Sequence, residues 1–141
     1  MALIQDADKV KIQERLKSLD HPVKLINFTQ ELECETCRDT RTLLQELAGL
    51  SGKLSLDVYN FAIDDIKAKE WHVDKIPATV IVGDKDRGIR FYGIPSGYEF
   101  GVLLDDILMV SGRDSELAAE SRKKLGGLKS PLHIQVFVTP T

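Results

Sequence analysis

The sequence predicts an α/β fold in which a central mixed sheet of four strands is flanked by helices, with one extra strand near the C-terminal end. Short apolar runs rich in β-branched residues alternate along the chain with longer amphipathic segments, in the order strand, helix, strand, helix, hairpin, helix. A strand–helix–strand crossover makes its two strands parallel, whereas a hairpin adds antiparallel strands to the same sheet. The length of 141 residues suits one compact unit.

The first half of the chain supplies the crossover. An amphipathic helix from about residue 5 ends before His21-Pro22, and the apolar run 23–29 follows as a central strand. A second helix opens at the two cysteines of Cys-Glu-Thr-Cys (34–37), because leucines recur at helical spacing after them until Gly49 and Gly52. The remaining expected elements are a strand at 54–59, a helix at 61–71, strands at 78–82 and 89–92 around the turn Gly-Asp-Lys-Asp-Arg-Gly, and a helix at 97–110.

The C-terminal part does not complete any further unit. A helical stretch at 115–125 ends at Gly126-Gly127, and residues 133–139 (HIQVFVT) have the pattern of a strand with no helix after it. This strand echoes the segment 24–29 (KLINFT), since both are apolar, contain phenylalanine and close on threonine. The echo indicates that the chain begins to repeat its own pattern. An exposed strand of this kind can dock on the edge of the first sheet, pair with a second copy of the chain or stay disordered, and we favour pairing between copies.

Composition narrows the classes of function. Nineteen Lys and Arg against 22 Asp and Glu give a net charge of −3, which supplies no positive field to hold nucleic acid or an anionic membrane. No stretch approaches the roughly 20 apolar residues that span a bilayer, and the N-terminus has no signal-peptide pattern. We therefore expect no nucleic-acid or membrane partner and, by default, a cytoplasmic location.

The two cysteines, Cys34 and Cys37, predict dithiol chemistry. They lie too close together to brace the fold by closing a long loop, and a lone close pair in a reducing compartment is typical of redox or metal chemistry. At a helix start, the N-terminal backbone N–H groups and the helix dipole favour a thiolate on Cys34, while Cys37 lies one turn in. We assign Cys34 as the nucleophile and Cys37 as the resolving thiol. No bound cofactor is required.

The charges around this pair point toward a reducing or neutral role. Glu31, Glu33 and Glu35 surround Cys34 in sequence, and only Arg38 and Arg41 oppose them. Like charges disfavour a thiolate. Cys34 is therefore expected to be less acidic than the attacking thiol of a strong oxidant.

Two other interpretations of the cysteines stay open. A four-coordinate zinc site needs two more ligands, and His21, His72 and His133 show no metal spacing, so a metal site would need cysteine pairs from two chains. The pair could also be redox-silent in a platform that only docks partners. Pro77 precedes the strand at 78–82, where a cis bond would expose the Ile76 backbone to a substrate segment, whereas a trans proline would simply end a loop.

The succession of strand, Cys-Glu-Thr-Cys, helix, strand, helix, Ile76-Pro77 and hairpin resembles the thioredoxin and glutaredoxin superfamily over residues 5–112. Residues 83–100 (GDKDRGIRFYGIPSGYEF) resemble the N-terminal unit of the protein disulfide oxidoreductases, glutaredoxin-like proteins with two such units in tandem. The resemblance implies a thioredoxin-like unit at 1–112, a linker helix at 113–130, and at 131–141 the first strand of an otherwise missing second unit. It also implies that Cys34 attacks, Cys37 resolves and Pro77 is the cis-proline.

Together, these observations predict a protein-disulfide oxidoreductase that uses Cys34 and Cys37, with Ile76 and Pro77 binding substrate. Its expected partners are protein disulfide substrates and an electron-donating reductase, with a homodimer formed through the C-terminal strand. The alternatives are a non-catalytic N-terminal platform half of a two-unit redox protein, or a CxxC metal binder.

Overall fold

Strand β1 (Val23–Thr29) lies at the centre of a mixed four-stranded sheet in the computed structural model, which describes residues 2–139. It pairs in parallel with β2 (Leu54–Asn60) and antiparallel with β3 (Ala78–Val82), and β3 pairs antiparallel with β4 (Asp86–Tyr92). The strand order is β2-β1-β3-β4. The predicted mixed sheet of four strands is confirmed. The helices are α1 (Asp6–Leu16), α2 (Cys37–Ala48), α3 (Asp65–Glu70), α4 (Tyr98–Gly112) and α5 (Ala119–Gly126).

The starts of α3 and β4 differ from the prediction for local reasons. α3 begins at Asp65 instead of residue 61, because the Asn60 side-chain oxygen accepts the backbone N–H groups of Ala62 and Ile63 and holds a turn there. β4 begins at Asp86 instead of residue 89, because Asp86 pairs with Val82 across a bulge in the β3–β4 ladder.

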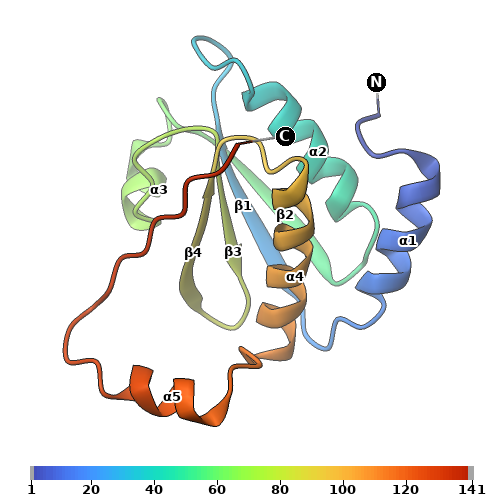
Figure 1. Cartoon of the computed structure of the whole chain (residues 1–141). Coiled ribbons are helices and arrows are strands. Elements are labelled where there is room, and N and C mark those ends of the chain that lie inside the picture. The colour runs from blue at the N-terminus through green and yellow to red at the C-terminus, as the bar shows by residue number, and fades with distance from the viewer. Residues whose placement is uncertain (1, 140–141) are drawn as a thin grey trace.

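The sheet separates two apolar layers. Leu25 and Ile81 pack with leucines of α2 and α4, whereas Ile26 and Val80 pack with Ala68 of α3. Successive strand residues point to opposite faces, so odd-numbered residues of β1 and β3 face α2 and α4, and even-numbered ones face α3. Figure 1 shows α3 on one side of the sheet and α1, α2 and α4 toward the other.

The C-terminal segment corrects one prediction. Residues 131–139 form no strand, and residues 140 and 141 of the predicted strand lie outside the described residues. A strand requires a hydrogen-bonded neighbour, but this segment runs past the sheet toward the start of α4 (Figure 1). There Phe137 and Val138 line a shallow hollow together with Tyr98 and Val102 of α4. The segment keeps its apolar side chains exposed, with Val136 79% and Phe137 88% accessible. The helix preceding it, α5, is exposed along its whole length.

Across residues 2–139, no helix is both long enough and apolar enough to cross a membrane.

Candidate active site

Cys34 and Cys37 are joined by a disulfide at the C-terminal edge of β1, with their Cα atoms 5.5 Å apart. Cys37 is the first residue of α2 and is fully buried, whereas Cys34 lies in the preceding loop and is partly exposed. Thr36 is the N-cap, so Cys34 lies two residues before the cap. The arrangement presents one sulfur toward solvent and encloses the other.

Backbone and hydroxyl contacts hold this helix start. The Thr36 carbonyl accepts the Thr40 backbone N–H at 2.9 Å and the Thr40 hydroxyl at 2.8 Å. The Thr29 hydroxyl, at the end of β1, donates to the Cys37 carbonyl at 3.5 Å. The last residue of β1 is therefore linked directly to the first residue of α2.

The charges around Cys34 are less one-sided than the sequence suggests. Glu31 forms an ion pair with Arg41 of α2, at 2.9 Å, so its charge is balanced locally. Glu33 and Glu35 stay exposed, and the Glu33 backbone adopts a left-handed φ of 57°. Two carboxylates therefore remain unbalanced next to Cys34 in the chain, and both are well solvated.

Pro77 lies at the same edge of the sheet as the disulfide. Phe28 of β1 pairs with Ala78 of β3, which places the residue before β3 beside the end of β1. The Ile76–Pro77 peptide bond is cis. The Pro77 carbonyl accepts the Gly93 N–H at 2.8 Å, while the backbone of Ile76 makes no hydrogen bond within residues 2–139.

A small charged cluster adjoins this proline. The Lys75 ammonium lies 2.8 Å from the Asp74 carboxylate and 4.6 Å from the centre of the Tyr92 ring. The hydrogen bond between Asp74 and Lys75 lowers the pKa of the Asp74 carboxyl and raises the pKa of the Lys75 amine. Both groups stay charged near neutral pH, next to Ile76.

Sequence reasoning missed a set of buried polar residues around the start of α2. Five polar residues are buried in the described chain, and four of them lie in β1, β3 and the first turn of α2: Asn27, Thr29, Thr40 and Thr79. Their signal was available, because Asn27 and Thr29 interrupt an apolar run that was expected to be central in the sheet. A polar residue inside such a strand must be paired or must serve a purpose.

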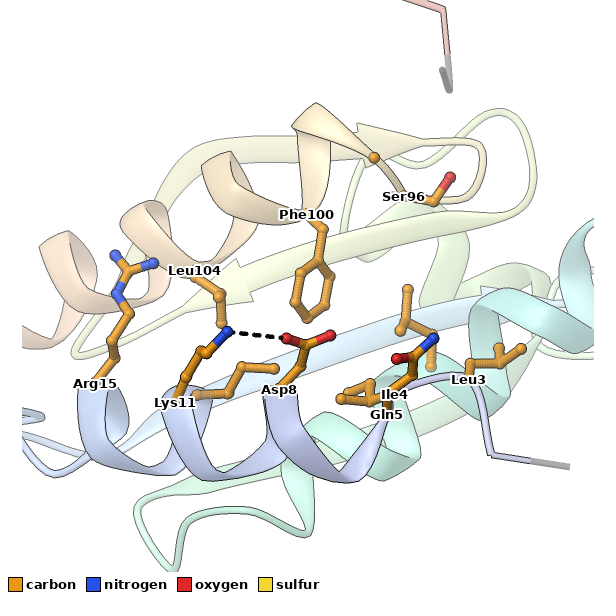
Figure 2. A pocket seen from close by; sticks show the side chains of 12 residues that line it. Leu3, Ile4, Gln5, Asp8, Lys11, Arg15, Ser96, Phe100 and Leu104 are labelled. Carbon is orange, nitrogen blue, oxygen red and sulfur yellow. Dashed lines mark ion pairs between the residues drawn. The ribbon is translucent and has the colours of Figure 1, made fainter.

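Within residues 2–139, the histidines do not form a metal site with the cysteines. No group of three or more His, Cys, Asp and Glu side chains in this part of the chain could hold a metal ion. A hollow of about 420 Å³ lies elsewhere, between α1 and α4, and is lined mainly by apolar side chains such as Ile12 and Phe100. Figure 2 shows Asp8 and Lys11 forming an ion pair along α1 at the side of this hollow, and neither cysteine lines it.

Comparison with solved structures decides the fold. A protein disulfide oxidoreductase from Aeropyrum pernix matches 96% of this chain with a TM-score of 0.88 and 29% sequence identity, and this chain covers 60% of that protein. Fasciola hepatica thioredoxin matches 70% of this chain with a TM-score of 0.51 and 16% identity, over 89% of its own length. The fold is thioredoxin-like.

This thioredoxin-like chain also has relatives among curated proteins. An alkyl hydroperoxide reductase component from Xanthomonas campestris pv. phaseoli is 32% identical over 129 residues, which is 92% of this chain. The chain spans about a fifth of the length of the curated relatives it matches (22% of this one). No protein-family profile matches it. The predicted resemblance to thioredoxin-like disulfide oxidoreductases is confirmed at the level of fold and similarity.

Proposed function

We propose that this chain is a thiol–disulfide oxidoreductase unit that exchanges disulfides with protein substrates through Cys34 and Cys37. The observation that carries the proposal is the disulfide at the start of α2, with a partly exposed Cys34 and a buried Cys37. Accessibility makes Cys34 the attacking thiol and Cys37 the resolving thiol. The 29% identical disulfide oxidoreductase and the alkyl hydroperoxide reductase relatives support a redox role.

In the reducing direction, the Cys34 thiolate attacks a substrate disulfide, forms a mixed disulfide and releases one substrate thiolate. Cys37 then loses its proton and attacks the Cys34 sulfur, which releases the second substrate thiolate and closes the Cys34–Cys37 disulfide. The substrate gains two electrons and two protons as its thiols form. An electron-donating reductase returns the pair to the dithiol, so the cycle needs no bound cofactor in this unit.

Substrate binding is proposed at the unpaired backbone of Ile76. Within residues 2–139 neither its N–H nor its C=O has a hydrogen-bond partner, so both can pair with an extended peptide segment, in the manner of strand addition to a sheet edge. Pro77 limits the conformations of this edge, because its ring fixes φ. Leu32 and Ile63, in the loops after β1 and β2, are each 77% exposed at this end of the sheet and could contact apolar side chains of an unfolded substrate.

The compartment belongs to the same proposal. A disulfide used as a switch needs a reducing pool that returns it to the dithiol. The two cysteines of this sequence both belong to that switch, so a reducing compartment would break no other disulfide in it. We place the unit in the cytoplasm on this ground. Cell fractionation with an antibody against the protein tests the placement.

Equilibration in glutathione redox buffers tests the proposed activity. The purified protein is trapped with acid, its free thiols are alkylated and the mass is measured. We expect a reversible two-electron transition between about −270 and −180 mV, the range between thioredoxin and protein disulfide isomerase. A Cys37→Ser variant is the control, because it cannot form the intramolecular disulfide. Thiols that never pair, or that pair irreversibly, would contradict the proposed activity. The non-catalytic platform would then be the better interpretation of this unit.

We propose that the C-terminal segment, which forms no strand in residues 131–139, corresponds in sequence to the first strand of a second thioredoxin-like unit, following a linker helix at 113–130. In this chain we propose that residues 131–141 pair with a second copy to form a homodimer. The exposed apolar side chains of Ile134, Val136 and Phe137 support this, because an exposed apolar segment is a ready surface for pairing with another chain. Light scattering at rising concentration tests it, with Val136→Lys as the comparison. A monomer at high concentration would contradict the dimer.

A further inference from the structure

Two buried polar atoms in the central strands of the sheet have no hydrogen-bond partner among the residues the structure describes. They are the side-chain oxygen of Asn27 (Oδ1) and the hydroxyl of Thr79 (Oγ1). Both residues are completely buried. An unpaired buried polar group costs free energy, so two of them in one place require an explanation.

The two residues form one site. Asn27 of β1 and Thr79 of β3 are direct partners in the antiparallel ladder, and paired residues of such a ladder project from the same face. That face is the one covered by α2 and α4, because Leu25 and Ile81, two positions away on each strand, pack against those helices. The pair therefore lies in the layer that contains the first turns of α2.

The orientation of the Asn27 amide is set by its surroundings. Its NH₂ group donates to the Ala78 carbonyl at 3.0 Å, which fixes the nitrogen toward β3 and leaves the oxygen unpaired. Two residues further along β1 on the same face, the Thr29 hydroxyl contacts the Cys37 carbonyl. Asn27 and Thr79 thus lie two residues inward from Thr29 and Pro77, on the face of the sheet to which the start of α2 is bonded.

Reduction of the disulfide creates new hydrogen-bonding groups on Cys37. As a disulfide, its sulfur has no hydrogen to donate. Reduction by two glutathione molecules breaks the Cys34–Cys37 bond, adds two electrons and two protons to the pair, and releases glutathione disulfide. The Cys37 thiol then carries a donor that suits an amide oxygen, and its thiolate is an acceptor that suits a hydroxyl.

We propose that Asn27 and Thr79 are positioning residues that hydrogen-bond the Cys37 sulfur when it is reduced. The pair is left unsatisfied in the disulfide form and satisfied in the dithiol form, so it biases the redox equilibrium toward the dithiol. Because the Asn27 and Thr79 side chains are neutral, this effect on the redox equilibrium does not depend on their protonation. The inference rests on the proposed function, since it assumes that the two cysteines cycle.

Thr79→Val and Asn27→Leu test the proposal, each measured in the glutathione equilibrium and by urea unfolding of both redox forms. Thr79→Val removes a hydroxyl that has no partner in the disulfide form and keeps the side-chain shape. We expect each variant to shift the equilibrium toward the disulfide by about tenfold, equivalent to about 30 mV for two electrons. The urea midpoint of Thr79→Val should rise in the oxidised protein and should not rise in the reduced protein.

Ser111→Ala is the matched control, because its buried hydroxyl is already paired with the His21 carbonyl at 2.7 Å near the C-terminal end of α4. It should change both redox forms equally. Equal changes in Thr79→Val, or an unchanged equilibrium, would overturn the inference while leaving the proposed function intact. If the wild-type thiols themselves do not cycle, the proposed function fails instead. Thr79→Val alone decides the matter if Asn27→Leu does not fold.

Discussion

The backbone N–H of Gly93 donates a hydrogen bond of 2.8 Å to the carbonyl of Pro77, so the loop before α4 is tied to the residue that precedes β3. Gly93 has a φ of +86°, in the left-handed region that favours glycine, and a Cβ added there would meet no atom within 4 Å. Any cost of a side chain at this position therefore comes from the backbone conformation and not from a clash.

Gly93→Ala should lower the free energy of unfolding by about 1 kcal/mol and slow disulfide exchange, because relaxation of the strained φ would shift the loop that holds Pro77. Gly88→Ala is the matched control. Gly88 has a φ of +84° and equally open surroundings, but it lies in β4. Urea unfolding should show similar losses for both variants, and only Gly93→Ala should slow reduction of a model protein disulfide. Equal rates of disulfide exchange in the two variants would show that the loop at Gly93 does not influence the site.

Replacing each cysteine by serine should have different consequences. Cys37→Ser removes the resolving thiol, so Cys34 should remain attached to its substrate in a mixed disulfide that non-reducing electrophoresis detects. Cys34→Ser should form no such adduct, because Cys37 is buried and cannot reach a substrate disulfide. Adducts that form through Cys37 instead would reverse the assignment of the two roles.

Arg90 should contribute strongly to stability. The Arg90 side chain is only 13% exposed. Its guanidinium donates to both carboxylate oxygens of Asp86 and twice to the Trp71 carbonyl. These hydrogen bonds join β4 to the end of α3. Arg90→Ala should lower the free energy of unfolding by about 2 kcal/mol, because buried hydrogen bonds to a charged group are lost. Arg87→Ala is the comparison: its ion pair with Asp84 is more exposed and should cost less than about 1 kcal/mol.

The same ion pair makes a prediction for acidic pH. The hydrogen bond from Arg90 lowers the pKa of the Asp86 carboxyl in the folded protein. Between the lowered pKa and the ordinary aspartate pKa, the unfolded chain therefore binds more protons than the folded chain. Asp86 stabilises the fold fully above this pH range, and the stabilisation is lost as the pH falls through it. Asp86→Asn should flatten the loss of stability on acidification, measured by urea unfolding at a series of pH values. An unchanged slope would contradict this.

Asp106 should behave with the opposite sign. Burial, with a smaller effect from the neighbouring Asp105 charge, raises the pKa of the Asp106 carboxyl. The folded chain binds more protons than the unfolded chain between the ordinary and the raised pKa, so stability falls as the pH rises through that window. Asp106→Asn should therefore raise the free energy of unfolding at pH 7 and leave it nearly unchanged at low pH. A variant that is destabilised at pH 7 would refute this sign.

The order and type of the elements from α1 to α5 followed from the amino-acid sequence alone. Apolar β-branched runs matched β1 and β3 at both boundaries, because a strand buried on both faces leaves a continuous apolar signal. The Cys34–Cys37 spacing likewise identified the candidate site, since few chemistries use two thiols three residues apart. Boundaries were less predictable at α3 and β4, where side-chain capping by Asn60 and a bulge beside Val82 decide where each element begins.

Tertiary structure settled what depends on contacts between distant residues. Only the fold shows that Arg41 balances Glu31, that Gly93 is bonded to Pro77, and that Asn27 and Thr79 face α2 together. The tail gives the clearest example. Its apolar alternation is that of a strand, yet residues 131–139 form none, because a strand exists only through hydrogen bonds to a neighbour and no strand of the described sheet pairs with this segment. Local pattern specifies which conformation a segment favours, and the partners available in space determine whether it is adopted.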